Sequence, residues 1–323
     1  VLSVLGMGGV VLGILVWQEG GESVVLLVTV GAVALGSLAW WLLRRKREGK
    51  VTLLDPDLFR HPNFTAGISA QMMQQIALGG VMIALPLFLQ MTLEYNAMQA
   101  GLSMAPLSLT MFATAVLVGK AKGRRRPAAI VRAGFVLASV GLAAIIPSVP
   151  RVDSGWYLVI PLVIVGCGFG LLVSQLNNYT LAPIEEDRIS EAAGVNSASG
   201  NFGLSFGLAV AGGVMLAALS FSFTTKVQES TVIPAAQQEQ ITAALEDDAE
   251  VMSNSQLDAL ITEESPEVEA AVLTINDDAR NLSLQIALMI PVLAGLLGLA
   301  NSFRMVRLPD IAPAGDLEGM DFG

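Results

Sequence analysis

The sequence contains few charged residues, and this shortage indicates the class of protein. Only 14% of the 323 residues are Asp, Glu, Lys or Arg, while 53% are hydrophobic. Soluble domains carry about 25% charged residues, so the composition excludes an ordinary soluble domain. The apolar runs are continuous and lack the alternation that is typical of transmembrane β-barrel strands. We therefore predict an all-α membrane protein.

Residue types that perform catalysis or bind metals are also scarce. The chain has one histidine, His61, and one cysteine, Cys167, which excludes a His-rich metal site and a disulfide framework. No acidic residue lies in the core of a predicted span, whereas an intramembrane enzyme needs such groups and proton coupling usually needs a buried carboxylate or histidine. We expect no enzymatic activity, no cofactor or metal ion, and no nucleic-acid partner.

Eight apolar runs approach the length of about 20 residues that a membrane-spanning helix requires. Pro86, Pro161 and Pro291 lie within three of these runs and are expected to kink the helices. The eight predicted spans are Val1–Trp17, Val24–Leu43, Phe64–Leu93, Gly101–Val118, Ala133–Val149, Trp156–Leu181, Ala192–Phe223 and Leu282–Ser302.

The basic residues predict how these spans are oriented. Fifteen of the 18 Lys and Arg residues fall in connections that alternate along the chain, so all fifteen can face the cytoplasm. The opposite side receives only Arg151, Lys226 and Arg280. Cytoplasmic loops are enriched in Lys and Arg, so both ends are predicted to be cytoplasmic, in a multi-pass protein of the plasma or inner membrane.

One connection, residues 222–278, is long and acidic, with 13 of the 28 Asp and Glu residues. Ser265, Pro266 and Glu267 form a typical helix start, with an N-cap, a proline at the first helical position and an early acid. We predict an extracytoplasmic loop of two or three short helices, the last of which runs into the final span. A solvated acidic linker is the alternative.

Amide side chains gather in three of the spans. An amide in hydrocarbon is costly unless it bonds to another polar group or lines a wet cavity. At a rise of 1.5 Å per residue, these amides fall in the cytoplasmic half of the membrane. We interpret them as a substrate cavity or a gate; hydrogen bonds between helices are the alternative. The set comprises Gln71, Gln74, Gln75, Gln175, Asn178, Asn196 and Asn201.

Two further groups of residues are expected to have structural roles. Glycines in two spans should permit close helix packing: Gly166, Gly168, Gly170, Gly203 and Gly207. A short basic loop between two spans can turn tightly and pair with acids or helix C-termini, or can serve as a simple positive-inside anchor. Its key residues are Gly119, Gly123, Arg124 and Arg125.

Three segments resemble a known family: Asn96–Pro106 at the start of a span, the basic loop Gly119–Arg126, and the glycine-rich Gly194–Gly203 with Gly207 beyond it. Together they are similar to the C-terminal portion of major facilitator superfamily transporters of the fourteen-spanner drug–proton antiporter type. At Gly200-Asn201 the sequence departs from the arginine-glutamine pair that is usual in that family.

The resemblance implies a domain organisation and an activity. Val1 would be an internal position, with six further spans and the proton-coupling residues in a preceding half. The partners would be the lipid bilayer, a small-molecule substrate and protons. The implied domains are two extra transmembrane helices (1–43), a cytoplasmic basic linker (44–63), a six-helix C-terminal transporter domain (64–221 and 279–303), the extracytoplasmic loop (222–278) and a cytoplasmic tail (304–323).

The leading hypothesis is a secondary transporter that exports drug-like or amphipathic compounds by proton-coupled efflux. An exporter of a specific endogenous metabolite, peptide or siderophore fits the sequence equally well. A polytopic membrane enzyme or a sensor is the alternative from a different class.

The orientation yields a prediction. In a Cys167-free background, a cysteine at Ser253 should react with a membrane-impermeant thiol reagent on whole cells, because the acidic loop is predicted to lie outside. A cysteine at Lys50 should remain unlabelled, because the basic linker is predicted to lie inside. The reverse labelling pattern would contradict the assigned orientation.

Overall fold

The described part of the protein, in a computed structural model, comprises residues 2–18, 23–50, 55–120, 126–151, 154–234, 238 and 266–309. Seven of its helices are long and apolar enough to cross a membrane, and α1 is a shorter apolar helix. The predicted all-α membrane fold is therefore confirmed. The helices are α1 (Leu2–Gln18), α2 (Val24–Arg47), α3 (Pro62–Met91), α4 (Ala97–Lys120), α5 (Pro127–Ile145), α6 (Val159–Leu181), α7 (Ile189–Glu229) and α10 (Pro266–Arg307).

Four short 3₁₀ helices complete the described elements: η1 (Pro56–Arg60), η2 (Val149–Arg151), η3 (Gly155–Leu158) and η4 (Glu186–Arg188).

Prolines mark both the starts and the interiors of these helices. Pro86 and Pro291 lie inside α3 and α10, as predicted. The kink expected at Pro161 is wrong, because α6 begins at Val159 and Pro161 occupies its first turn. A backbone N–H in the first turn has no partner within its own helix, so a proline there removes no intrahelical bond.

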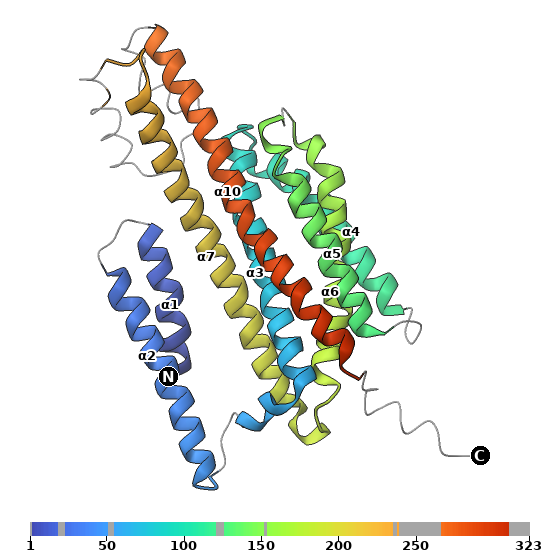
Figure 1. The fold of residues 1–323 in the computed structure, drawn as a ribbon. Helices are drawn as coiled ribbons and strands as arrows, with labels where there is room; N and C mark the ends of the chain where they lie inside the picture. The colour runs from blue at the N-terminus through green and yellow to red at the C-terminus, as the bar shows by residue number, and fades with distance from the viewer. Residues whose placement is uncertain are drawn as a thin grey trace.

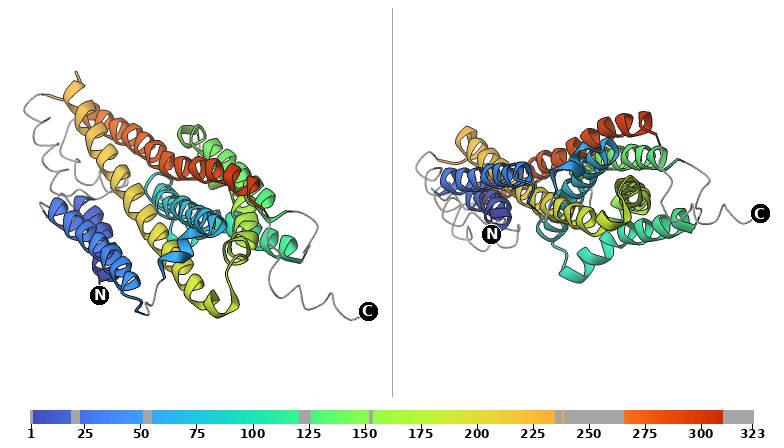
Figure 2. Two further views of the ribbon diagram at one scale, coloured as in Figure 1. Left: turned by 60° about the horizontal axis from the view of Figure 1, so that its bottom comes forward. Right: turned by 90° about the horizontal axis from the view of Figure 1, so that it is seen from below.

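Six helices form the main bundle, in which α3 and α6 hold central positions (Figure 1). Helix α3 packs against α7, α10 and α6, while α6 packs between α4 and α5. The remaining two, α1 and α2, pair as a hairpin through close contact of Gly9 with Gly31, and α1 lies beside α7 (Figure 2).

Glycines on α6 bring three helices together at close range. A Cβ atom added at Gly166 would lie 2.4 Å from the Leu107 carbonyl oxygen of α4, and one at Gly170 would lie 2.5 Å from the Met111 oxygen. One at Gly168 would lie 2.4 Å from the Ala138 nitrogen of α5. These distances are shorter than real Cβ contacts, so the backbones approach this closely only because side chains are absent.

The contact between α3 and α7 has the same basis. A Cβ atom at Gly207 would lie 2.3 Å from the Ile76 carbonyl oxygen, and one at Gly203 would lie 2.8 Å from the Met72 oxygen. From the other side, a Cβ atom at Gly79 would lie 2.4 Å from the Leu204 oxygen. The two backbones are therefore in direct contact over more than one turn.

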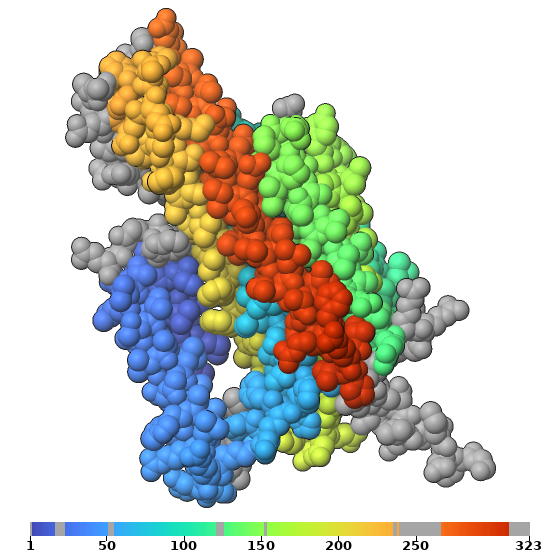
Figure 3. Space-filling model, in the orientation of Figure 1, coloured from blue at the N-terminus to red at the C-terminus, as the bar shows by residue number. Residues whose placement is uncertain are grey.

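Helices α7 and α10, of 41 and 42 residues, are each about 60 Å long at 1.5 Å per residue. This is about twice the hydrocarbon thickness of a bilayer, and the pair projects beyond the rest of the bundle (Figure 3). Two kinds of contact join the helices there. Phe223 and Val227 pack with Val272, and Lys226 forms a 2.7 Å ion pair with Asp278.

Both long helices continue into the predicted loop, residues 222–278, where a helix that runs into the final span was expected. Residues 222–229 continue α7, and residues 266–278 form the first part of α10, which begins at the proline expected at the first helical position. Residues 239–265, where further short helices were predicted, lie outside the described residues, as do residues 310–323 of the predicted tail.

The close α3–α7 contact predicts the effect of adding a single methyl group. Gly207→Ala should lower the melting temperature of the detergent-solubilised protein, because relieving the clash with Ile76 costs about 1–3 kcal/mol. The matched control is Gly194→Ala on the same helix, where an added Cβ meets nothing within 4 Å. It should leave the melting temperature unchanged or raise it, since alanine favours helix by up to about 1 kcal/mol. Equal effects of the two substitutions would contradict the packing described.

Candidate functional site

The first half of α7 exposes a polar stripe to its surroundings. The exposed residues between 190 and 205 are all small or polar, and their spacing puts them on one side of the helix. We call this set the α7 polar stripe: Ser190, Gly194, Ser197, Ala198, Asn201 and Ser205.

The exposed side of α10 has the opposite character. Between residues 282 and 303 every exposed side chain on α10 is apolar: Leu282, Met289, Leu293, Leu296, Leu297, Ala300 and Phe303. An apolar face suits contact with lipid, whereas polar residues inside a membrane face the protein interior or a water-filled cavity. The contrast between the two helices distinguishes a lipid-facing side of the bundle from a side suited to water.

The end of α6 adds amides next to the start of α7. Asn177 and Asn178 are exposed and Gln175 is partly exposed. The Nδ2 group of buried Asn196 donates a 3.0 Å hydrogen bond to Oδ1 of Asn177 and so joins the two helices. Asn177 was not among the predicted site residues, although it lies in the same polar run as Gln175 and Asn178.

The three glutamines of α3 divide between two neighbouring helices. Gln71 and Gln75 lie beside Gly200 of α7, where an added Cβ would be 3.4 Å from the Gln71 Nε2 atom. Gln74 is only 2% exposed. Gly67 packs against α6, because a Cβ atom added there would contact Thr180. Gln74 lies two helical turns further along α3 and therefore on the same face, toward α6.

Several amide oxygens in this region have spare hydrogen-bonding capacity. Among the described residues, the buried oxygens Gln74 Oε1, Gln75 Oε1 and Asn196 Oδ1 have no hydrogen-bond partner. A buried acceptor without a partner costs about 1–3 kcal/mol, so a donor from water or a bound molecule would be favourable there. Unpartnered acceptors therefore lie on α3, at Gln74 and Gln75, and at Asn196 near the start of α7.

The basic loop is described only at Gly119, Lys120 and Arg126. Gly119 lies in the last turn of α4, and an added Cβ there would meet nothing within 4 Å. Gly123, Arg124 and Arg125 lie outside the described residues. In the described ranges, no group of three or more His, Cys, Asp and Glu residues could hold a metal ion.

A charged network joins three segments at the end of the bundle where α3 and α7 begin. Lys46, at the end of α2, pairs with Asp55 at 2.6 Å and also with Asp57. Arg188, which precedes α7, lies 3.4 Å from both Asp55 and Glu191. The backbone N–H of Asp55 donates to the Glu191 carboxylate. This network links the α1–α2 hairpin to the six-helix bundle.

The network stabilises the ionised form of its carboxylates. The backbone N–H of Asp57 and the ammonium group of Lys46 lower the pKa of Asp55 below its ordinary value. The hydrogen bond from Lys46 also lowers the pKa of Asp57. The network was not predicted from the sequence, in which Lys46 and Arg188 indicate only a cytoplasmic excess of basic residues.

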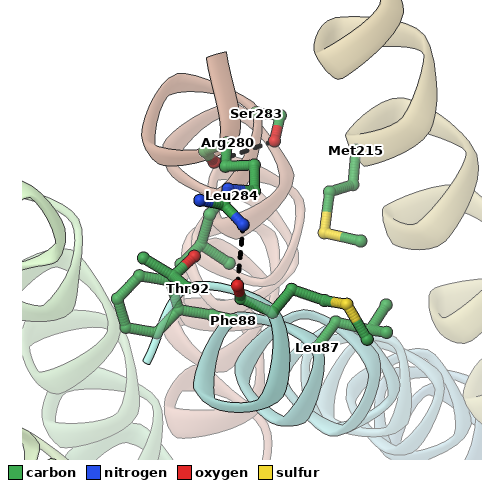
Figure 4. Close-up of a pocket in the computed structure, with 8 residues that line it drawn as sticks. Leu87, Phe88, Thr92, Met215, Arg280, Ser283 and Leu284 are labelled. Atoms are coloured by element: carbon green, nitrogen blue, oxygen red, sulfur yellow. Dashed lines mark hydrogen bonds between the residues drawn. The ribbon is translucent and has the colours of Figure 1, made fainter. Parts of the chain in front are cut away.

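A buried arginine closes the opposite end of the bundle. Arg280 of α10 is 3% exposed, and its Nη1 donates a 2.7 Å hydrogen bond to the Met91 carbonyl oxygen at the end of α3. Its Nη2 also pairs with Asp277. Figure 4 shows Arg280 over the end of α3, with Phe88 and Thr92 nearby. A cation at a helix C-terminus is favoured by the helix dipole, so Arg280 ties α3 to α10.

The charged network predicts a defined pH dependence. Asp55→Ala should lower the melting temperature at neutral pH, because it removes the partner shared by Lys46 and Arg188. A lowered carboxyl pKa gives stabilisation that is present above the unfolded-state pKa of about 3.9 and is lost as the pH falls through the lower folded-state pKa.

The difference in melting temperature between wild type and Asp55→Ala should therefore be constant from about pH 7 to 5 and shrink only below about pH 4. Glu185→Ala, at an exposed acid near Arg188, is the matched control and should have little effect. A difference that disappears near pH 6 would show that the network does not stabilise the fold as described.

Residues 2–231 match the family described as Major Facilitator Superfamily. The chain is 27% identical over 207 residues to a probable actinorhodin transporter of Streptomyces coelicolor, covering 63% of this chain and 36% of that protein. It is 32% identical over 148 residues to the lincomycin resistance protein LmrB of Listeria monocytogenes, covering 44% of this chain and 30% of that protein.

A third relative is the multidrug resistance protein Stp of Mycobacterium tuberculosis, 27% identical over 218 residues, which cover 67% of this chain and 40% of that protein. The aligned segments thus span 30–40% of the length of these three relatives. The family match runs from residue 2 to residue 231, more than two-thirds of the chain. As the resemblance in the sequence predicted, this chain belongs to the Major Facilitator Superfamily.

Proposed function

We propose that this chain is the C-terminal portion of a secondary active transporter that exports drug-like or amphipathic compounds across the cell membrane. The observation that carries the proposal is the contrast between the α7 polar stripe, on the helix that Asn196 joins to Asn177 of α6, and the apolar exposed face of α10. The names of the relatives, two of which are resistance proteins, support the same class of substrate.

In this proposal the α7 polar stripe and the nearby amides form one wall of a substrate path. Gly200 leaves space beside Gln71 and Gln75, and the unpartnered oxygens of Gln74 and Gln75 can accept hydrogen bonds. A substrate donor would replace water at these oxygens, while its apolar part contacts neighbouring side chains. With the predicted orientation, the wall lies in the cytoplasmic half and opens toward the cytoplasm.

Transport by this fold requires a second wall. Alternating access in this class of protein is a rocking of two six-helix halves about a site between them. The aligned segment spans only 30–40% of each relative discussed, so the proposal places the opposing wall in a second half. The proposal also assigns proton coupling to residues of that half.

A second candidate is the export of one specific endogenous metabolite. The observation that favours it is the similarity to a probable actinorhodin transporter, which aligns over 63% of this chain. Both candidates use the same wall, so they differ in selectivity and not in the location of the path.

Substitutions at the wall test the proposal in the full-length transporter. Asn201→Ala and Gln74→Ala should each weaken apparent substrate affinity about 2- to 10-fold, because each removes one hydrogen bond worth roughly 0.5–1.5 kcal/mol. Leu297→Ala, on the apolar face of α10, is the control and should leave affinity unchanged. Affinity is measured by concentration-dependent efflux from vesicles, normalised to the amount of folded protein.

If both amide variants lose folded protein while the remainder transports with unchanged affinity, the amides have a structural role and the substrate path lies elsewhere.

A further prediction concerns the chain expressed by itself. It should insert into membranes as a helical protein but should not move a fluorescent substrate across vesicles in a proton gradient, because one wall cannot alternate. The full-length transporter in the same vesicles is the positive control. Gradient-driven transport by the chain alone would refute the requirement for a second half.

A further inference from the structure

The outer side of α2 combines an apolar surface with a basic end. Helix α2 packs on α1 at the edge of the bundle, and among its described residues only Gly31, Ala34 and Leu42 are buried (Figure 1). On the opposite side, exposed residues recur at the spacing of three and four that defines one helix face. We call this set the α2 track: Val33, Gly36, Trp40, Arg44 and Arg47.

The first part of the α2 track suits contact with a hydrocarbon chain. Val33 is exposed, and a Cβ atom added at Gly36 would meet nothing within 4 Å. The absence of a side chain at Gly36 therefore leaves the helix backbone open to an acyl chain that lies along α2.

Two tryptophans mark the level at which this apolar part ends. Trp40 is 62% exposed and Trp41 is 41% exposed. Exposed tryptophans of membrane proteins concentrate at the boundary between hydrocarbon and water, at the level of the lipid headgroups. Arg44 follows Trp40 by four residues, or about 6 Å along the helix. The arginines of the α2 track are thus expected at the level of lipid phosphate groups.

The guanidinium groups next to the tryptophans are held over the indole rings. The Cζ atom of Arg44 lies 5.4 Å from the ring centroid of Trp40, and that of Arg45 lies 5.0 Å from the ring centroid of Trp41. Both distances fall within the range of about 6 Å for a cation–π interaction. Stacking uses the face of each guanidinium group and leaves the N–H groups at its edge available for an anion.

Arg44 and Arg47 keep donors that the described part of the protein does not use. The Nε group of Arg44 donates a 3.1 Å hydrogen bond to Glu48. Within the described ranges, the terminal amino groups of Arg44 and the guanidinium group of Arg47 have no acceptor. Residues three apart are neighbours on a helix surface, so the two arginines can bind one phosphate group, which matches the planar donor geometry of arginine.

The other basic side chains of this segment already have partners in the protein. Lys46 lies off the α2 track and pairs with Asp55 and Asp57 in the charged network. Lys50 pairs with Glu48 at 2.7 Å. The free positive charge at this end of α2 is therefore concentrated on the side that also carries the apolar surface.

We propose that the α2 track binds an anionic phospholipid, with the phosphate between Arg44 and Arg47 and one acyl chain along Trp40 and Gly36. The site selects a headgroup and so goes beyond general residence in a bilayer. It does not depend on the proposed transport function. A free phosphate ion shares the headgroup chemistry but has no acyl chain, so the experiment separates the two sources.

The test is native mass spectrometry of the purified full-length transporter in detergent, titrated with phosphatidylglycerol or with phosphatidylcholine of the same acyl chains. Arg44→Gln and Arg47→Gln should each weaken binding of phosphatidylglycerol about fivefold, the size expected for one basic residue at an anionic lipid surface. Binding of phosphatidylcholine should not change. Arg60→Gln is the matched control, because its side chain is 83% exposed near the same end of α2 but belongs to η1.

Gly36→Leu is an independent variant that changes no charge and adds a side chain where nothing lies within 4 Å. It should weaken binding of phosphatidylglycerol severalfold without lowering the melting temperature, because it obstructs the acyl chain. Equal binding of the two lipids in the wild type, unchanged binding in both arginine variants, or an equal loss in Arg60→Gln would overturn the proposal. Inorganic phosphate at millimolar concentration should not displace the lipid. Displacement by phosphate, or no effect of Gly36→Leu, would indicate a phosphate-ion site and would also overturn it.

Discussion

Direct contact between helix backbones is the interaction on which the rest of this bundle depends. Lipid tails are as apolar as the side chains they touch, so little hydrophobic force drives spanning helices together, and close packing must supply the stability. Gly203 and Gly207 let α7 reach the backbone of α3, while glycines of α6 do the same toward α4 and α5. The same contact leaves Gly200 beside Gln71, so helix packing also positions the amides.

The two ends of the bundle are closed by charge. At one end, Asp55 connects Lys46 of the α1–α2 hairpin with Arg188 before α7. At the other end, Arg280 donates a hydrogen bond to the Met91 carbonyl oxygen at the end of α3. Between these ends the exposed faces differ sharply, with small polar residues on α7 and large apolar ones on α10. A transporter needs this combination, because its substrate path must be wet while its outer surface remains in lipid.

Much of this arrangement could be predicted from the sequence, because the requirements of a bilayer are local. The apolar runs predicted the helices, and the polar run around Asn196 predicted part of the wall that we propose. The charged network around Asp55 could not be predicted, because Asp55 and Glu191 are 136 residues apart in the sequence. The sequence pattern does not indicate how α3 and α7 are aligned relative to each other. The pairing of α7 with α10 beyond the main bundle was predicted only in part, because the sequence indicated a helix that runs into the last span but not the ion pair between Lys226 and Asp278.

The most direct test of the account is whether the α7 polar stripe contacts water. Cysteines placed at Ser197, Asn201 and Leu296 in a Cys167-free full-length transporter would be treated with a small hydrophilic thiol reagent in open membranes. The account predicts rapid labelling at Ser197 and Asn201, slowed by transported substrate, and almost none at lipid-facing Leu296. Labelling at Leu296 as fast as at Asn201, or none at either α7 position, would contradict the claim that this stripe lines the substrate path.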